Sequence, residues 1–312
     1  MDDAPISTAM LGGCSMEDLW SESVGDWYRV FIGVCGPPEA AALPWVFLTD
    51  ANGTFAMTVD IVRHLQLGGH LPDMVIIGLG YPAATLRDTI ERRARDLTPT
   101  PGPMTSDDGA AFHTGGADRF LDTIEHAVLP LLERRLPAPT RRVLYGHSLG
   151  GLFALHAWLR DRPQFSDFIV ASPSTWWDDH WIDRQLDLVT HHASQRQGNI
   201  VVCVGAEESS QGRIAAAAQL PIEFRTPLIR PPRDMAADAE DLAHRLAAAA
   251  DPSSHVWFQR IPNEHHVSIP PLAISHGLRI LFDAPGAAAL SAQIDSPTTH
   301  SPPHRDATLK AP

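Results

Sequence analysis

The stretch RRVLYGHSLGGLFALHAWL, residues 141–159, contains the pattern that decides the fold of this chain. An apolar run ends in Gly146-His147-Ser148-Leu149-Gly150, and a segment of helical period follows directly. A strand, a sharp turn and a helix in this order form a nucleophile elbow, whose serine adopts a strained backbone conformation. A side chain at either glycine would collide with the adjoining strand or helix. We therefore expect Ser148 to present its hydroxyl at a helix N-terminus, where the Leu149 N–H can donate to an oxyanion. The alternative is a glycine-rich turn in which Ser148 only caps the helix.

Apolar runs of strand length alternate with segments of helical period along the chain, which predicts an α/β fold. In such a fold a mostly parallel sheet is covered by helices on both faces. Apolar residues that recur every three or four positions mark the helices. The first strand is the candidate for an antiparallel position. The expected strands are 26–35, 45–50, 74–81, 142–147, 168–171, 200–205 and 256–261, and the expected helices are 55–67, 119–135, 151–160, 235–250 and 272–282.

The chain divides into three parts by composition. Residues 26–284 carry all the expected elements and form one catalytic domain, preceded by an N-terminal extension, 1–25. Residues 285–312 are rich in Ser, Pro, Thr, His and Ala, and we expect a disordered tail. Within the domain, residues 95–116 are a candidate functional loop, and residues 176–195 are a candidate cap over the site.

Composition and charge exclude several classes of function. The net charge is −13, from 24 Lys and Arg against 37 Asp and Glu, and no basic run is present, so nucleic acid is not an expected partner. No secretory signal and no run of 18 apolar residues is visible, so we expect a cytoplasmic protein that does not bind membranes. The three cysteines are not spaced for zinc and are expected to be reduced thiols, and we expect no metal. The oligomeric state stays open.

A serine hydroxyl needs a base within hydrogen-bond reach, and in chain order the base follows the acid. The segment NEHHVSIPP lies between an expected strand and an expected helix, which is where the base belongs. His265 and His266 both satisfy that position. His276 falls within the following helix and fits a surface residue.

The acid that orients the base is expected at the carboxyl end of another strand. Glu207 and Glu208 end the run NIVVCVGAEESS and are the leading candidates, with Glu208 favoured. Asp178 and Asp179, which follow the preceding strand and a tryptophan pair, compete with them.

The second oxyanion donor is expected in the loop after an earlier strand. The run VFLTDANGTF supplies Asp50, Ala51 and Asn52 there, and the backbone N–H of Ala51 or Asn52 is the candidate. The alternative is an Asx turn without a chemical role.

Beyond single motifs, a combination of motifs between residues 27 and 282 resembles one branch of the α/β-hydrolases. This branch holds esterase D, the feruloyl esterases and the esterases of catecholate siderophores. Within it, the chain is most similar to the enzymes that open the trilactone of enterobactin and salmochelin. The motifs are LTDANGTF, IIGLGY, RRARDLTPTP, YGHSLGGLFALHAWL, ASPSTWWDD and NEHHVSIPPL.

The resemblance implies an α/β-hydrolase fold and hydrolysis of a carboxylic ester without a cofactor. It implies that Ser148 is the nucleophile and that His266, which stands before Val-Ser-Ile-Pro, is the base. It also favours Glu208 as the acid, as the fourth residue of Gly-Ala-Glu-Glu.

The substrate implied is a small-molecule ester, here a siderophore ester that is anionic and aromatic. Arginine and aromatic side chains would suit it, although Arg95 could instead form an exposed ion pair with Asp96. The open alternatives are a feruloyl or short-acyl esterase, an acyltransferase or thioesterase, and a non-catalytic binding protein. The candidate substrate-binding residues are Asp50, Arg93, Arg95, His147, Trp176, Trp177 and His265.

Overall fold

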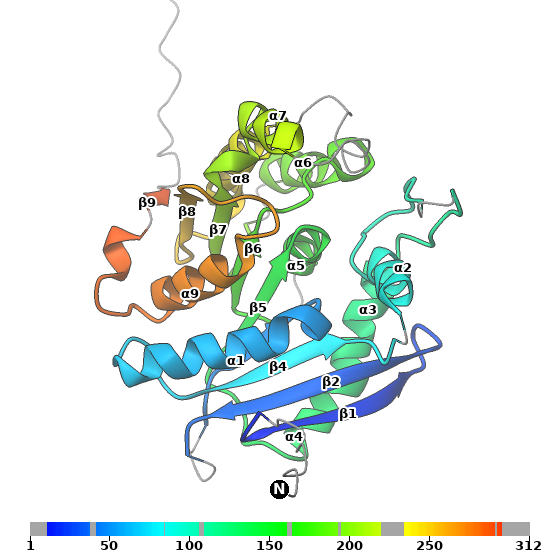
Figure 1. Ribbon diagram of the computed structural model, residues 1–312, viewed down its shortest axis with the longest axis vertical. Coiled ribbons are helices and arrows are strands. Elements are labelled where there is room, and N and C mark those ends of the chain that lie inside the picture. Colours follow the sequence, from blue (N-terminus) through cyan, green and yellow to red (C-terminus); the bar gives the residue numbers. More distant parts are fainter. Residues whose placement is uncertain are drawn as a thin grey trace, which may run out of the picture.

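In the computed structural model the described helices pack around one sheet (Figure 1). Within the described residues, nine strands pair in the order β1-β2-β4-β3-β5-β6-β7-β8-β9. The described residues are 11–37, 42–83, 85–105, 109–160, 164–192, 195–219, 234–290 and 292–294.

The centre of the sheet is parallel and its margins are antiparallel. Strands β4, β3, β5, β6, β7 and β8 run parallel to their neighbours, while β2 pairs antiparallel with β4, β1 with β2, and β9 with β8. The predicted antiparallel position of the 26–35 strand is confirmed. The strands are β1 (Cys14–Ser21), β2 (Asp26–Cys35), β3 (Trp45–Leu48), β4 (Met74–Gly80), β5 (Arg142–His147), β6 (Asp167–Ala171), β7 (Asn199–Gly205), β8 (Val256–Ile261) and β9 (Ala292–Ile294).

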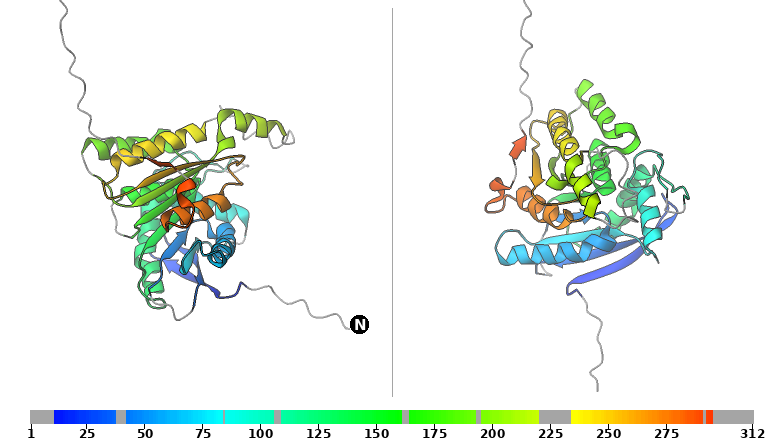
Figure 2. Two further views of the ribbon diagram at one scale, coloured as in Figure 1. Left: turned by 90° about the vertical axis from the view of Figure 1, so that its left-hand side faces the viewer. Right: turned by 45° about the horizontal axis from the view of Figure 1, so that its top comes forward.

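Helices cover both faces of the sheet, because successive strand residues alternate between two apolar clusters. Val46, Val143 and Ile169 face α1 and α9, whereas Phe47 and Leu144 face the helices of the other layer. Figure 2 shows α1 and α9 on the side of the sheet opposite α3. The α-helices are α1 (Ala51–Leu67), α2 (Leu86–Asp96), α3 (Ala117–Thr123), α4 (Leu129–Glu133), α5 (Leu149–Leu159), α6 (Trp177–His191), α7 (Ser210–Gln219), α8 (Met235–Ala249) and α9 (Pro270–Leu281).

Three shorter helical turns complete the described elements. The π-helical turn η1 (Ile124–Val128) joins α3 to α4, so the predicted helix 119–135 is one continuous helical segment. The 3-10 turns are η2 (Ala206–Glu208) and η5 (Ala287–Ala289).

Several elements were not predicted from the sequence. Strand β1 lies within the N-terminal extension, and η5 and β9 lie within the segment expected to be disordered, whose residues 295–312 are outside the described residues. The segment expected as a cap forms helix α6, whose Ile182, Leu186 and Val189 are buried in the helical layer with α5 and α8. In the described part of the chain, no helix has the length and apolarity of a membrane span.

The parallel register brings the carboxyl ends of the central strands to one edge. His147 of β5 pairs with Ala171 of β6, Ala171 pairs with Cys203 of β7, and Gly205 at the end of β7 pairs with Ile261 of β8. The segments that follow these strands therefore start side by side, and they carry Ser148, Glu208 and His266.

Substitution of two helical glycines tests how closely α9 packs on the sheet. A Cβ at Gly277 would lie 2.6 Å from Ile169 Cγ2, whereas a Cβ at Gly53 of α1 would have no neighbour within 4 Å. We expect Gly277→Ala to lower the free energy of unfolding by about 1–3 kcal/mol through overpacking. The matched variant Gly53→Ala should leave it unchanged or raise it by up to about 1 kcal/mol. Denaturant unfolding measures both, and equal values would contradict the close contact.

Candidate active site

Ser148 lies in the turn between β5 and α5, and its backbone is strained. Its φ is 59° and its ψ is −116°, a conformation that residues with a side chain rarely adopt. A Cβ at Gly146 would lie 1.9 Å from the Gly150 carbonyl oxygen, and a Cβ at Gly150 would lie 2.3 Å from Thr49 Oγ1. Only glycine fits at either position, as the elbow pattern predicts.

Backbone hydrogen bonds hold Ser148 in this conformation from the neighbouring strand. The Ser148 N–H donates to the Ala171 carbonyl at 3.0 Å, and the Ser174 N–H donates to the Ser148 carbonyl at 3.1 Å. The two serine hydroxyl oxygens lie 3.3 Å apart. Among the described hydrogen bonds, the Ser148 hydroxyl therefore pairs with Ser174 and not with His266.

Glu208 and His266 form a hydrogen-bonded pair at the same edge of the sheet. Glu208 follows β7 in η2, and His266 lies in the loop between β8 and α9. The His266 Nδ1 lies 2.7 Å from Glu208 Oε2. The other carboxylate oxygen, Oε1, accepts hydrogen bonds from the Ser172 hydroxyl and, at 3.0 Å, from the Gly205 N–H. Because a carboxylate only accepts, Nδ1 carries the proton and Nε2 is left as the basic nitrogen.

This pair distinguishes the four carboxyl groups that the sequence left open. Among the described hydrogen bonds and ion pairs, Glu207, Asp178 and Asp179 have no contact with His266. Asp178 instead accepts a hydrogen bond from the Thr100 hydroxyl at 2.9 Å.

The Glu208 carboxylate is ionised although it is buried. Burial acts to raise the pKa of Glu208, but the hydrogen bond and charge of His266, together with the Ser172 and Gly205 donors, lower it by more. The net result is a pKa below the ordinary value of a glutamic acid. The negative charge is therefore available to orient His266.

His147 packs against the histidine of this pair. The two ring centroids lie 4.6 Å apart. Burial, with added effects of the nearby His266 and Arg93, lowers the pKa of His147 to about 3 against the opposing effect of Glu208. The His147 Nε2 is buried without a hydrogen-bond partner among the described residues. The lowered pKa favours a neutral His147 ring, and its contact with substrate stays a prediction.

The predicted oxyanion loop adjoins the elbow. A Cβ at Gly150 would lie 3.3 Å from Asp50 Oδ2, so the start of α5 contacts the start of α1. The N–H groups of Ala51, Asn52 and Leu149 have no acceptor among the described hydrogen bonds. The Asn52 amide bonds both backbone groups of Tyr81, at 2.9 Å each, and thereby fixes the loop.

Comparison with known proteins identifies the family. The family model described as "Putative esterase" matches residues 34–254. The chain belongs to this family. The siderophore triacetylfusarinine C esterase of Aspergillus fumigatus is 32% identical to this esterase over 248 residues, which cover 77% of this chain and 82% of that protein. The ferri-bacillibactin esterase BesA of Bacillus subtilis is 28% identical over 286 residues, covering 88% and 91%.

Solved structures show the same fold. The siderophore hydrolase EstB from Aspergillus nidulans has a TM-score of 0.75 at 22% identity, covering 89% of this esterase and 98% of that chain. EstA from the same organism has a TM-score of 0.72 at 24% identity, covering 90% and 98%. The predicted α/β-hydrolase fold is confirmed, and the family relationship confirms that the protein is a carboxylic ester hydrolase.

Arg93 of the esterase is held within the site. Its Nε donates to Asp50 Oδ1 at 2.7 Å, and a terminal nitrogen donates to the His147 carbonyl at 3.3 Å. The guanidinium thus joins the oxyanion loop to the elbow. Direct contact of Arg93 or Asp50 with substrate stays a prediction.

Arg95 forms a structural ion pair, and its expected contact with substrate stays a prediction. Its guanidinium bonds Asp96 at 2.6 Å and 3.0 Å and Asp26 at 2.8 Å. Asp96 is fully buried and also accepts a hydrogen bond from the Tyr28 hydroxyl at 2.6 Å. The ion pair considered from the sequence exists, but it is buried and not exposed, because Asp96 requires charge compensation in the interior.

The two neighbouring tryptophans, Trp176 and Trp177, differ in their exposure. Trp177 is 1% exposed, and its Nε1 donates to the Thr100 hydroxyl at 3.1 Å, so the expectation that it offers a face to substrate is wrong. Trp176 is partly exposed, as a wall of a pocket would be. The His265 residue is exposed, and its N–H bonds the Ser268 hydroxyl at 2.9 Å. Substrate contact by Trp176 and His265 stays a prediction.

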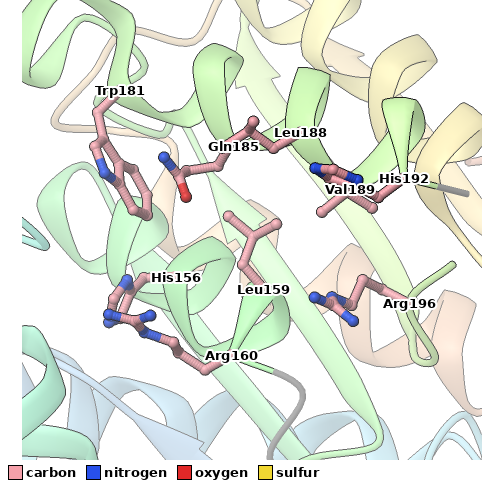
Figure 3. Close-up of a pocket in the computed structure, with 9 residues that line it drawn as sticks. All are labelled: His156, Leu159, Arg160, Trp181, Gln185, Leu188, Val189, His192 and Arg196. Atoms are coloured by element: carbon pink, nitrogen blue, oxygen red, sulfur yellow. The ribbon is translucent and has the colours of Figure 1, made fainter. Parts of the chain in front are cut away.

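A cavity of about 290 Å³ lies between α5 and α6 and contains none of the predicted site residues (Figure 3). Its lining includes the end of α5 that is distant from Ser148, where His156 bonds Asp118 at 2.9 Å.

A separate cluster of side chains contains Asp122, Glu125 and His126, whose potential metal-ligand atoms lie within 4.8 Å of one another. Those three residues lie on α3 and η1, which carry no predicted site residue.

Two residues of the site were missed from the sequence. Ser172 contacts Glu208, and Ser174 contacts Ser148. Both belong to the motif ASPSTWWDD, whose place directly after a strand was the available signal.

The low pKa of His147 can be tested by NMR. We expect its ring signals to stay those of neutral imidazole from pH 8 to pH 5, because burial lowers its pKa to about 3. The unfolded chain would bind this proton near pH 6.5, so His147 lowers the free energy of unfolding as the pH falls below that value. The variant His147→Gln cannot bind the proton and should lose less of its free energy of unfolding over the same pH range. A titration midpoint of His147 near 6.5 would contradict its burial beside His266.

Proposed function

We propose that this esterase cleaves its substrate through an acyl-enzyme at Ser148, with His266 as the base and Glu208 as the acid. The observation that carries the proposal is the 2.7 Å hydrogen bond between His266 and a buried, ionised Glu208, beside a serine in the strained elbow conformation. Nucleophile, base and orienting acid are the parts that acyl transfer requires.

The reaction has two steps. Ser148 Oγ attacks the ester carbonyl carbon while His266 Nε2 takes the hydroxyl proton, and that proton then passes to the leaving alcohol. Water then attacks the acyl-enzyme and gives a proton to His266, which passes it to Ser148 Oγ as the acyl–oxygen bond breaks, so that the carboxylic acid and the free serine are released. In the resting site the Ser148 hydroxyl pairs with Ser174, so it must turn toward His266 when substrate binds.

Backbone N–H groups stabilise the developing oxyanion. Leu149 lies at the N-terminus of α5, and Ala51 and Asn52 lie at the N-terminus of α1. Their N–H groups have no acceptor among the described hydrogen bonds, and the two helix N-termini adjoin. Donors that are held in place before the reaction lower its barrier more than donors that must reorganise.

The substrate we propose is a siderophore ester, with a catecholate trilactone as the first candidate. Two relatives that cover most of this chain are named as esterases of siderophores, triacetylfusarinine C and ferri-bacillibactin. Arg93 and the partly exposed Trp176 are the candidate cation and aromatic face, although Arg93 also pairs with Asp50. Arg95 pairs with Asp96, and Trp177 is buried against Thr100.

The catalytic roles are tested by hydrolysis assays on wild type and two variants. Ser148→Ala and His266→Gln should each reduce turnover by about 10³-fold or more, as removal of a catalytic group does. The matched variant is His276→Gln on α9, where the His276 ring bonds Gln259 of β8, and it should retain wild-type turnover. Labelling by a serine-directed fluorophosphonate should require Ser148. Wild-type activity in Ser148→Ala would overturn the assignment.

The substrate is tested on the same enzyme with a panel of esters. The panel holds ferric and iron-free enterobactin, triacetylfusarinine C, ferri-bacillibactin, methyl ferulate and p-nitrophenyl acetate. Ser148-dependent hydrolysis of the siderophores that is much faster than that of the simple esters supports the proposal. Activity confined to feruloyl or short-acyl esters would overturn the substrate but not the mechanism. Capture of the acyl group by an added alcohol, in preference to water, would indicate an acyltransferase.

A further inference from the structure

The turn after β6 is strained at a buried serine. Ser172 has a φ of 40° and is 0% exposed. Its N–H donates to the Cys203 carbonyl of β7 at 2.8 Å, so the turn begins within the sheet. A non-glycine residue in the left-handed region persists only where its surroundings impose it, and such residues gather at functional sites. The strain at Ser172 therefore calls for a role of its side chain.

The Ser172 hydroxyl acts on one oxygen of Glu208. It donates to Oε1, which also accepts the Gly205 N–H at 3.0 Å. The opposite oxygen, Oε2, faces His266 Nδ1 at 2.7 Å. Two donors that converge on Oε1 fix the rotation of the carboxylate, because any turn about the last side-chain bond would break both hydrogen bonds.

The same turn contacts the nucleophile. The Ser174 N–H donates to the Ser148 carbonyl at 3.1 Å, and Ala171, the last residue of β6, accepts the Ser148 N–H at 3.0 Å. Residues 171–174 thus bond to both Ser148 and Glu208. No other described segment has hydrogen bonds to both of these residues.

We propose that Ser172 is a positioning residue for the catalytic machinery: its hydroxyl orients Glu208 so that the free carboxylate oxygen holds His266 in the productive tautomer. The proposal rests on the proposed function, because it assigns Ser172 a part in the action of Glu208. Gly205 supplies a backbone donor that no side-chain substitution removes, so the contribution of Ser172 can be measured by itself.

A structural role alone would have a different signature. A hydroxyl that only satisfied a buried carboxylate would affect stability, and its loss would matter whether or not Glu208 took part in catalysis. A positioning hydroxyl affects turnover only through Glu208. The two cases are separated by a double-mutant cycle on kcat.

The experiment measures kcat and KM for p-nitrophenyl acetate and the rate of fluorophosphonate labelling. Ser172→Ala should lower kcat and the labelling rate by about 10- to 100-fold, the effect of one hydrogen bond to a charged group, with KM changed by less than about twofold. In the Glu208→Ala background the same substitution should change either rate by less than about twofold. Glu208→Gln provides a second background if Glu208→Ala does not fold.

Two further variants show whether a loss of activity comes from the missing Ser172 hydroxyl, from backbone strain or from lower stability. Ser172→Gly removes the hydroxyl and relieves the left-handed backbone, and it should lose as much activity as Ser172→Ala. Ser21→Ala removes another buried serine hydroxyl, which pairs with Thr123 at 2.6 Å on elements outside the site, and should keep wild-type kcat. Thermal unfolding of each variant confirms that it is folded.

The outcomes distinguish this inference from the function on which it rests. If Ser148→Ala and Glu208→Ala lose activity while Ser172→Ala keeps it, the role of Ser172 is wrong and the proposed function stands. Equal losses from Ser172→Ala in the wild-type and Glu208→Ala backgrounds would also overturn the positioning role. If Ser148→Ala keeps wild-type activity, the proposed function itself fails.

Discussion

The close crossing of β5 and α5 at the elbow is the constraint on which the site depends. Gly146 and Gly150 leave no room for a Cβ, so the chain can turn from strand to helix within one residue, Ser148. That residue takes the strained conformation, and its hydrogen bonds to the Ala171 carbonyl and from the Ser174 N–H hold it there. Since the elbow also abuts Asp50, the same crossing sets the position of the oxyanion loop. The sheet supplies the free energy that this local strain costs.

The parts of the fold that the sequence predicts are those with strong apolar periodicity. The central strands are buried on both faces and read as continuous apolar runs, so their ends were predicted to within two residues. Strand β1 and helix α2 were missed for the converse reason. Most β1 residues are at least partly exposed, and α2 buries only Ala94 and Asp96. Neighbouring elements hold each of them in place, and the sequence of neither shows a strong apolar periodicity.

The candidate site was predictable where residue type and position coincide. The elbow glycines, the histidine before Val-Ser-Ile-Pro and the acid pair at the end of β7 all stand at strand ends. Arg95 and Trp177 show the limit of this reasoning. Both suit an anionic aromatic ligand by type, yet Asp96 and Thr100 engage them, and those contacts come from packing that no local pattern reveals. Ser172 was missed because its role depends on a carboxylate 36 positions away in sequence.

The dispersal of the site along the chain has a consequence for how the enzyme is made. The His266–Glu208 hydrogen bond spans 58 positions, and the Ser172–Glu208 bond spans 36. The first requires that β7 and β8 lie side by side, and the second requires the same of β6 and β7. Non-local pairings of this kind form slowly. During synthesis Ser148 emerges well before His266. On the proposed mechanism, the nascent chain gains activity only when nearly the whole domain has left the ribosome, so activity would report that these strands have paired.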